Sequence, residues 1–315
     1  MNAEQLRDWL KRNLPHQSTD FDVTYVLNWG GFVNHSYTVT DGAARYHLKL
    51  TNDKGILAGL QTWRSLHRIL ESRYRTPAMI DWLDLSEIGF SGLMLRHIEG
   101  GTADLSSKPD IIPPLIETAS RLHQDDEIRR YFAGTSLPKT RFDHFVATYM
   151  ARFSSDMECI AADPPPFISP ERLQWMEEQA RRLREAANRI PSFHLPTTEP
   201  VHGDLHQGNV LVSDNDWFIV DWDDLSLGDP ALEFAILLWP LIHRAGRRWQ
   251  DFISADLDSG FGERMEICLR AQLLDEVIDV VADYVQASVI PSDQDRVRRI
   301  KRQQHEEALA CYRSL

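Results

Sequence analysis

Residues 201–212 read VHGDLHQGNVLV, and this stretch places polar side chains between two apolar runs. Asp204 precedes Asn209 by five residues, and Asp221 follows Asn209 by twelve, within the segment IVDWDD. A carboxylate can accept or orient the proton of a hydroxyl nucleophile, while an Asn carbonyl and a second carboxylate can hold Mg²⁺ against triphosphate oxygens. The spacing therefore favours phosphoryl transfer, a reaction that requires positioning and charge neutralisation.

Each of these residues has a simpler interpretation when it is taken alone. Asp204 and Asn209 are residue types that form Asx turns, and Asp221 could simply end a strand. The combination of all three at this spacing favours the chemical interpretation. We expect the loop that carries them to be held rigidly by its apolar neighbours, Val201 and residues 210–212.

The bulk composition narrows the class of protein. The chain has 315 residues, which suffices for one large domain or for two lobes. Its net charge of −13 argues against nucleic-acid binding, which needs a clustered excess of Lys and Arg. The three cysteines lack CxxC spacing, which argues against a zinc cluster or a disulfide framework. There is no signal-peptide pattern and no apolar run near the about 18 residues of a membrane span, so we expect a cytoplasmic protein.

The first hundred residues have the apolar alternation of a small antiparallel sheet. Asp41-Gly42 indicates a tight hairpin, because both residue types tolerate positive φ. Apolar residues at helical spacing predict one helix over 56–70. We expect five strands, at 21–28, 32–40, 44–50, 78–83 and 92–98.

The remainder of the chain is predicted to be mostly helical. The exception is the segment 200–223, which contains the short β-like runs NVLV and WFIVDW. The fold class is therefore α+β, with a β-rich N-lobe over 1–98 and a larger α-rich C-lobe over 99–315. The expected C-lobe helices cover 111–124, 141–160, 170–189, 230–243, 262–287 and 293–313.

HGDLHQGN followed by IVDWD resembles the aminoglycoside phosphotransferase and choline kinase family, the small-molecule relatives of the eukaryotic protein kinases. The segment LGDPALEFA (227–235) extends the resemblance, although Glu233 stands where the family usually has Asp. RLHQ (121–124) is similar to the Leu-His pair that closes a helix ahead of the catalytic loop. The resemblance covers most of 25–245. It implies a protein-kinase-like two-lobe fold and Mg²⁺- and ATP-dependent transfer of phosphate to a hydroxyl of a small molecule.

The resemblance also implies roles for individual residues. Asp204 becomes the catalytic base or the carboxylate that orients the hydroxyl, and Asn209 and Asp221 become the metal ligands. Two further residues of the loop, His202 and His206, are candidates for supporting roles. For His202 we favour a structural role, in which its ring bonds backbone near the metal segment, over direct chemistry.

A kinase also needs backbone and a cation near the phosphates. Gly30 and Gly31 lie between two expected strands, where the absence of side chains would let backbone N–H groups approach phosphate. Taken alone, the same pair could be an ordinary hairpin turn. Lys49 lies in the strand that follows, and an inward-facing Lys should meet a phosphate or a carboxylate. The alternative is a Lys that faces solvent from an edge strand.

The sequence departs from the family at the partner of this Lys. Relatives carry an acidic residue on the following helix, whereas residues 55–70 contain no Asp or Glu. Gln61 stands at about the expected place, with Asp53 and Glu71 as fallback partners. In relatives the adenine binds the strip that joins the lobes, which here contains Arg96, His97 and Ile98.

The sequence contains fewer signals for the site of the phosphate acceptor than for that of the nucleotide. Asp223 and Asp224 give the region after the metal segment a high negative density, which makes them candidate acceptor-site residues. Asp275, Asp279 and Asp283 recur every four residues, and like charges at that spacing repel. A cationic acceptor is one possible partner for this acidic face. We favour the simpler interpretation, in which the face meets the basic stretch 296–302 of the following helix or only solvent.

Two other functions share these motifs. A bacterial protein Ser/Thr kinase would have the same fold, but no activation segment follows IVDWDD, and the chain leads directly into LGDPALEFA. A pseudokinase would bind nucleotide without turnover. The missing acidic partner of Lys49 supports this hypothesis, whereas the intact Asp204, Asn209 and Asp221 argue against it. Acceptor identity, nucleotide preference and oligomeric state are not indicated by the sequence.

Overall fold

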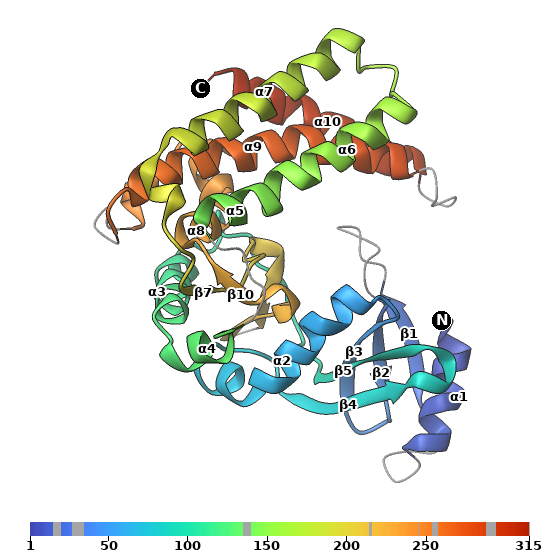
Figure 1. Ribbon diagram of the computed structural model, residues 1–315. Helices are drawn as coiled ribbons and strands as arrows, with labels where there is room; N and C mark the ends of the chain where they lie inside the picture. The colour runs from blue at the N-terminus through green and yellow to red at the C-terminus, as the bar shows by residue number, and fades with distance from the viewer. Residues whose placement is uncertain are drawn as a thin grey trace. The chain divides into compact units, whose positions relative to one another are not determined.

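The computed structural model of the chain describes residues 1–14, 20–26, 35–134, 140–213, 216–244, 246–253, 258–287 and 294–314. It divides into two compact units (Figure 1). Unit 1 contains residues 1–104 and 202–225, and unit 2 contains residues 105–201 and 226–315. The glycine pair Gly30 and Gly31, expected near the phosphates, lies outside the described residues.

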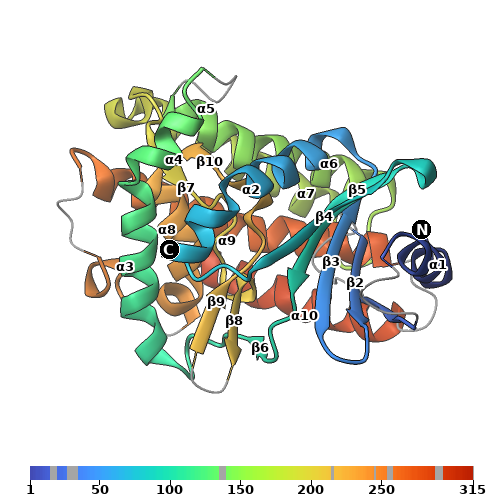
Figure 2. The ribbon, with the colours of Figure 1, turned by 90° about the horizontal axis from the view of Figure 1, so that it is seen from below.

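Unit 1 is built on an antiparallel sheet of five strands, as the alternation of its sequence predicts (Figures 1 and 2). The strand order is β1-β2-β3-β5-β4, which places β3 in the middle, between β2 and β5. Each described strand lies within a few residues of its expected range. The strands are β1 (Asp22–Val26), β2 (His35–Thr40), β3 (Arg45–Thr51), β4 (Met79–Leu85) and β5 (Phe90–Arg96).

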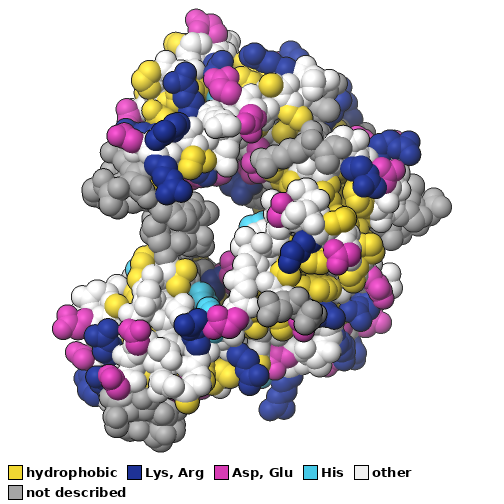
Figure 3. All heavy atoms as spheres, turned by 180° about the vertical axis from the view of Figure 1, so that it is seen from behind, with side chains coloured by type: hydrophobic (Ala, Val, Ile, Leu, Met, Phe, Trp, Pro, Cys, Tyr) yellow, Lys and Arg dark blue, Asp and Glu magenta, His cyan; other side chains and the backbone are white. Residues whose placement is uncertain are grey.

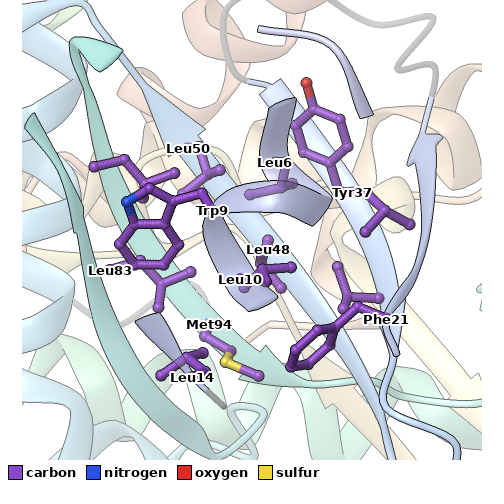
Figure 4. Close-up of a cluster of buried hydrophobic side chains, with 13 residues drawn as sticks. Leu6, Trp9, Leu10, Leu14, Phe21, Tyr37, Leu48, Leu50, Leu83 and Met94 are labelled. Carbon is purple, nitrogen blue, oxygen red and sulfur yellow. The ribbon is translucent and has the colours of Figure 1, made fainter. Parts of the chain in front are cut away.

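Helix α1 (Ala3–Asn13) covers one face of this sheet. A capping box between Asn2 and Gln5 starts the helix, and its apolar stripe packs against the strands (Figure 4). Leu48 and Leu50 of β3 belong to this cluster and are fully buried. Because side chains alternate along a strand, Lys49 must face the opposite side of the sheet.

Helix α2 (Lys54–Arg73) contacts strands β3, β4 and β5. Asp53 caps its first turn by accepting hydrogen bonds from the N–H groups of Gly55 and Ile56. The helix also packs against the 3₁₀ turn Trp222–Asp224. At Gly59 the approach is so close that a Cβ atom would lie 2.1 Å from the carbonyl oxygen of Asp223. Gly59 therefore lets backbone meet backbone at this contact.

A second, three-stranded sheet explains why residues 202–225 belong to unit 1. Strand β6 (Gly101–Thr102) pairs with β8 (Val210–Ser213), which pairs with β9 (Asp216–Ile219). The expected division of the chain was at 98/99, with both motif segments in the second part. Residues 202–209 are called the catalytic loop below, after the role expected of Asp204, and residues 219–224 the metal segment, after the role expected of Asp221. In the structure the catalytic loop and the metal segment instead share a compact unit with the N-terminal sheet, because the pairing of β6 with β8 ties them to it.

Unit 2 is mainly helical, as predicted, and α9 packs against α6, α7, α8 and α10. None of the helices in the described parts of the chain is long and apolar enough to cross a membrane. The two strands β7 (Glu199–Val201) and β10 (Ser226–Gly228) pair antiparallel. The helices are α3 (Ile112–His123), α4 (Asp126–Tyr131), α5 (Arg141–Phe145), α6 (Ala151–Ala162), α7 (Pro170–Arg189), α8 (Pro230–Trp239), α9 (Phe261–Gln286) and α10 (Gln294–Arg313).

The motif residues outside the catalytic loop hold unit 2 together. Asp229 caps α8, and its other carboxylate oxygen accepts a hydrogen bond from Arg264 at 2.8 Å, with both side chains buried. Glu233, which replaces the usual Asp of the family, is bonded to Nε2 of His123 at 2.7 Å. These contacts give LGDPALEFA and RLHQ a structural role, because they join α8 to α9 and to α3.

Surface charge is mixed in both units. On the face shown in Figure 3, Lys and Arg side chains are interspersed with Asp and Glu. Several of these charges form exposed ion pairs within one helix, such as Arg181 with Glu178 on α7. Water and salt screen pairs of this kind, so they contribute little to the stability of the fold.

The acidic face of α9 is partly neutralised by neighbouring helices. Asp283 is paired with Lys301 of α10, which belongs to the basic stretch expected as its partner. Asp275 is paired with Arg152 of α6, a partner the sequence did not suggest. Burial, together with Asp279, raises the pKa of Asp275 to about 8 in spite of Arg152. Arg152 therefore compensates the acidic face only in part.

We expect Gly59→Ala to destabilise the protein by about 1–3 kcal/mol, because the added Cβ would push the Trp222–Asp224 turn away from α2. At a helix position without such a contact, Gly→Ala stabilises the folded protein by about 0.5–1 kcal/mol. The sign of the change in unfolding free energy therefore shows whether the close contact exists. Gly262→Ala in α9 is a matched control, since its Cβ would make ordinary contact with Trp249 at 3.4 Å. Urea unfolding measures both variants, and equal effects would contradict the close contact at Gly59.

A second prediction concerns pH. Because the folded pKa of Asp275 lies above the usual 3.8 of an Asp, the folded state holds an extra proton between about pH 4 and 8. Stability should therefore fall as the pH rises through this window, and Asp275→Asn should reduce that fall. Asp110→Asn, at an exposed position, should follow the wild type. Thermal unfolding at several pH values tests this, and parallel curves for all three proteins would contradict it.

Candidate active site

Unit 1 contains a cavity of about 260 Å³ lined by residues from both of its sheets. Lys49 of β3, Asn209 of the catalytic loop and Asp221 of the metal segment all line it. Three candidate residues separated by up to 172 positions in the sequence thus meet around one space. The apolar part of the wall consists of Val26, Trp63, Pro77, Leu95, Ile98, Leu211 and Val220.

The catalytic loop owes its shape to Gly203 and Asn209. Gly203 has a φ of +90°, and a Cβ atom there would lie 2.4 Å from the carbonyl oxygen of Asp224, so only glycine fits. The side-chain amide of Asn209 donates to the backbone oxygen of Asp204 at 2.8 Å and to its Oδ2 at 3.1 Å. This arrangement fixes the carboxylate of Asp204 and leaves Oδ1 as the end of the Asn209 amide that can bind a metal ion.

The two histidines of the loop hold its backbone. His202 is completely buried, and its Nδ1 accepts a hydrogen bond from the N–H of Asp204 at 3.3 Å. Its Nε2 must then carry the proton, which it donates to the carbonyl oxygen of Val220 at 2.9 Å. His206 accepts from the N–H of Gly208 through Nδ1, and its Nε2 lies 3.4 Å from Oδ2 of Asp204. His202 therefore links the catalytic loop to the residue before Asp221.

Asp221 has a backbone conformation that few residues adopt. Its φ of +68° and ψ of +53° lie in the left-handed region, which Asp tolerates better than most residue types. Such strain persists at functional sites when the surroundings enforce it. The bond from His202 to Val220 on one side and the Trp222–Asp224 turn on the other supply that enforcement. The carboxylate of Asp221 is thereby directed at Lys49, with which it forms an ion pair.

Lys49 is buried and paired with two carboxylates. Its side chain is only 6% exposed, so the alternative of a Lys that faces solvent does not hold. Its ammonium contacts Asp221 and lies 2.6 Å from Oδ1 of Asp223. Burial by itself would lower the pKa of Lys49, but the two carboxylates outweigh this effect and raise it. The cation is therefore charged at neutral pH.

The expectation that Gln61 is the partner of Lys49 is not met. Gln61 is exposed, and Trp63 of the same helix lies on the side of Lys49, with its ring centroid 6.0 Å from the ammonium. Of the fallback partners, Asp53 caps α2, and Glu71 accepts a hydrogen bond from the N–H of Met79 at 2.6 Å. Helical spacing predicted which turn of α2 approaches the sheet but placed the contact two residues too early.

The region after Asp221 also differs from expectation. Asp223, a candidate for the acceptor site, contacts Lys49 instead. Reduced hydration, with the nearby carboxylates of Asp223 and Asp204, raises the pKa of Asp224 to about 6. Asp224 therefore shares the electrostatic environment of Asp204, and its backbone packs against Gly203.

The strip expected to bind the adenine lines the same cavity, through Arg96, His97 and Ile98. The N–H of Arg96 donates to the carbonyl oxygen of Ala78 at 2.8 Å, and that of His97 donates to the carbonyl oxygen of Arg45 at 3.1 Å. Both donors are therefore occupied by the sheet. Among the described residues no acceptor bonds the N–H of Ile98, which makes it the available donor of this strip.

His47 is a cavity residue that the sequence did not suggest. It lies two residues before Lys49 on β3, and the strand alternation that places Lys49 in the cavity places His47 there too. Burial lowers its pKa to about 4, so its ring is neutral near pH 7. The periodicity of YHLKL was the signal that could have identified it.

The donor set around the cavity fits a Mg²⁺ ion bound together with a nucleotide. Asp221 offers a carboxylate, and Asn209 offers an amide oxygen. Within the described ranges no cluster of three or more His, Cys, Asp or Glu side chains could hold a metal by itself. Mg²⁺ is usually bound by one or two carboxylates plus phosphate oxygens and water, so two protein ligands suffice only if phosphates complete the set.

Comparison with known proteins identifies the family. The model of the phosphotransferase enzyme family (APH) matches residues 24–267. No curated protein matches the sequence. Solved structures match over nearly the whole chain, at identities that show a shared fold and no more.

The apo form of a thermostable mutant of aminoglycoside phosphotransferase APH(4)-Ia is 14% identical, covers 98% of both chains and has a TM-score of 0.64. The GDP complex of wild-type aminoglycoside 2'-phosphotransferase-IIIa is 16% identical, covers 98% of this chain and 99% of that one, and has a TM-score of 0.62. Choline kinase from Cryptosporidium parvum Iowa II is 13% identical, covers 100% and 96%, and has a TM-score of 0.58. These structures confirm the kinase-like α+β fold. Because the family model spans well over half of the chain, the protein belongs to the phosphotransferase enzyme family.

Proposed function

We propose that the protein transfers the γ-phosphate of ATP, with Mg²⁺, to a hydroxyl group of a small molecule. The observation that carries this proposal is the meeting of Lys49, Asn209 and Asp221 in one cavity, with Asp204 held beside Asn209. A buried cation, a fixed carboxylate and two metal-binding oxygens are the groups that phosphoryl transfer requires.

The nucleotide would occupy the cavity of unit 1. Its apolar wall suits a purine, the N–H of Ile98 offers a hydrogen bond to the base edge, and Lys49 offers a charge to the phosphates. A related structure supports the binding of a nucleotide, since a mutant of APH(4)-Ia was solved with ADP and hygromycin B. Mg²⁺, bound by Asn209 and Asp221, would neutralise charge on the phosphate oxygens.

Asp204 would act on the acceptor. Its carboxylate is 46% exposed, so a hydroxyl group can reach it from solvent. The acceptor oxygen attacks the γ-phosphorus while its proton passes to Asp204, and the bond from that phosphorus to the bridging oxygen breaks to release ADP. Asn209 and His202 hold Asp204 in place by hydrogen bonds, which limits the reorganisation that the step requires.

A small acceptor is favoured over a protein substrate. Only residues 225–229 separate the Trp222–Asp224 turn from α8, which leaves no length for an activation segment. A pseudokinase is disfavoured because Lys49 has carboxylate partners in spite of the missing helix residue. The alcohols that we propose to test as acceptors are aminoglycosides, choline, ethanolamine, homoserine and simple sugars.

The proposal predicts Mg²⁺-dependent consumption of ATP with one class of acceptor from this panel. Asp204→Asn should lower kcat by about 100-fold or more, because a positioned general base contributes about 10²–10⁴. Asp22→Asn, at an exposed position of β1, is the control and should leave kcat unchanged. The measurement is coupled detection of ADP, with the phosphorylated product identified by mass spectrometry.

Two outcomes would count against this function. Turnover that survives in the Asp204→Asn protein would place the base elsewhere. Mg²⁺-dependent ATP binding without turnover across a broad panel of alcohols would favour the pseudokinase alternative.

A further inference from the structure

Helix α2 cannot supply a counter-ion to Lys49 from its own sequence. Residues 55–70 contain no acidic residue, and the two carboxylates that flank this stretch, Asp53 and Glu71, bond backbone N–H groups. An ammonium that is 6% exposed and unpaired would cost several kcal/mol. The charge must therefore be neutralised from another part of the fold.

The Trp222–Asp224 turn supplies that charge. Oδ1 of Asp223 lies 2.6 Å from Nζ of Lys49, and the Asp223 side chain is only 15% exposed. The carboxylate is thus largely shielded from water, and removing either member of such a pair would leave the other charge poorly compensated.

Gly59 makes this approach possible. A Cβ at position 59 would lie 2.1 Å from the carbonyl oxygen of Asp223, so any side chain there would displace the turn. One helical turn later, Trp63 places its indole ring beside Lys49. Helix α2 thus contributes an indole beside the cation and a glycine against the turn that carries Asp223, and the carboxylate beside Lys49 comes from that turn.

We propose that Asp223 is the positioning residue for Lys49 and replaces the acidic residue that is missing from residues 55–70 of α2. This inference rests on the proposed function. The carboxylate of Asp221 would both bind the metal ion and pair with Lys49, and it cannot do both fully at the same time. Asp223 keeps the ammonium in place when Asp221 binds the metal, so that Lys49 remains directed at the phosphates.

Asp223 lies two residues from Asp221, so two other roles must be distinguished from this one. It could be a further metal ligand, or it could contact the acceptor. In both of those roles its effect would be independent of Lys49. If it acts by holding Lys49, its effect must vanish once Lys49 is removed, which a double-mutant cycle detects.

The kinetic cycle uses Lys49→Met, Asp223→Asn and the double variant, with the acceptor found in the panel. Asp223→Asn should lower kcat/KM for ATP about tenfold, and Lys49→Met should lower it about 100-fold or more. The double variant should match Lys49→Met within about twofold. Asp223→Glu, which keeps the charge, should recover part of the loss, and Gln61→Ala is the control expected to behave as wild type.

A further loss from Asp223→Asn in the Lys49→Met background would overturn the inference, because Asp223 would then act independently of Lys49. Wild-type kinetics in Asp223→Asn would overturn it as well. Absence of turnover in the wild type would instead overturn the proposed function, and the catalytic part of the inference with it. The two failures are therefore distinguishable.

The same cycle on the ligand-free protein provides a readout that does not depend on activity. Asp223→Asn should lower the urea midpoint in the wild-type background, because it removes a partner of a buried cation. In the Lys49→Met background it should be neutral or stabilising, because it then removes a buried carboxylate that repels Asp221. A midpoint that falls equally in both backgrounds would overturn the pairing.

Discussion

The burial of one ammonium group organises unit 1. The neighbours of Lys49 on β3, Leu48 and Leu50, belong to the apolar cluster beneath α1. Because successive side chains of a strand point to opposite faces of the sheet, Lys49 lies on the other face. A buried cation requires carboxylates, and both come from a segment more than 170 residues away. The ion pairs thus join the catalytic loop to the N-terminal sheet, and the same contact closes the cavity of unit 1.

The metal segment meets several constraints with few residues. Asp221 adopts a left-handed backbone conformation between a hydrogen bond from His202 and a turn that packs on Gly59. Each of these supports is itself buried or sterically tight, which fixes the backbone from which the Asp221 carboxylate projects. A rigid site of this kind lowers the reorganisation cost of phosphoryl transfer, since the charges are in place before the reaction begins.

Unit 2 shows a different use of charge. Asp229 and Arg264 form a buried pair that fixes the start of α8 against α9, while the excess carboxylates on α9 are held only in part by Arg152 and Lys301. The sequence indicated the partner of Asp283, because the basic stretch 296–302 follows directly in the chain. It did not indicate Arg152, which comes from α6 and whose proximity depends on how the helices pack.

The sequence by itself determined the fold class, the strands of the N-terminal sheet, most of the helices and the family, because periodicity and the spacing HGDxxxxN with IVDWD are local properties of the chain. The short elements β6 and α4 were not predicted. It also indicated that Lys49 needs a partner, since burying an unpaired cation costs free energy in any protein. Which residue answers that need was decided by tertiary structure alone. On α2, Trp63 rather than Gln61 lies beside the ammonium of Lys49, although the two residues are only two positions apart. The carboxylate of Asp223 reaches the ammonium because its turn packs closely against Gly59. Contacts between segments far apart in the chain depend on packing distances of a few ångströms, and no local pattern encodes them.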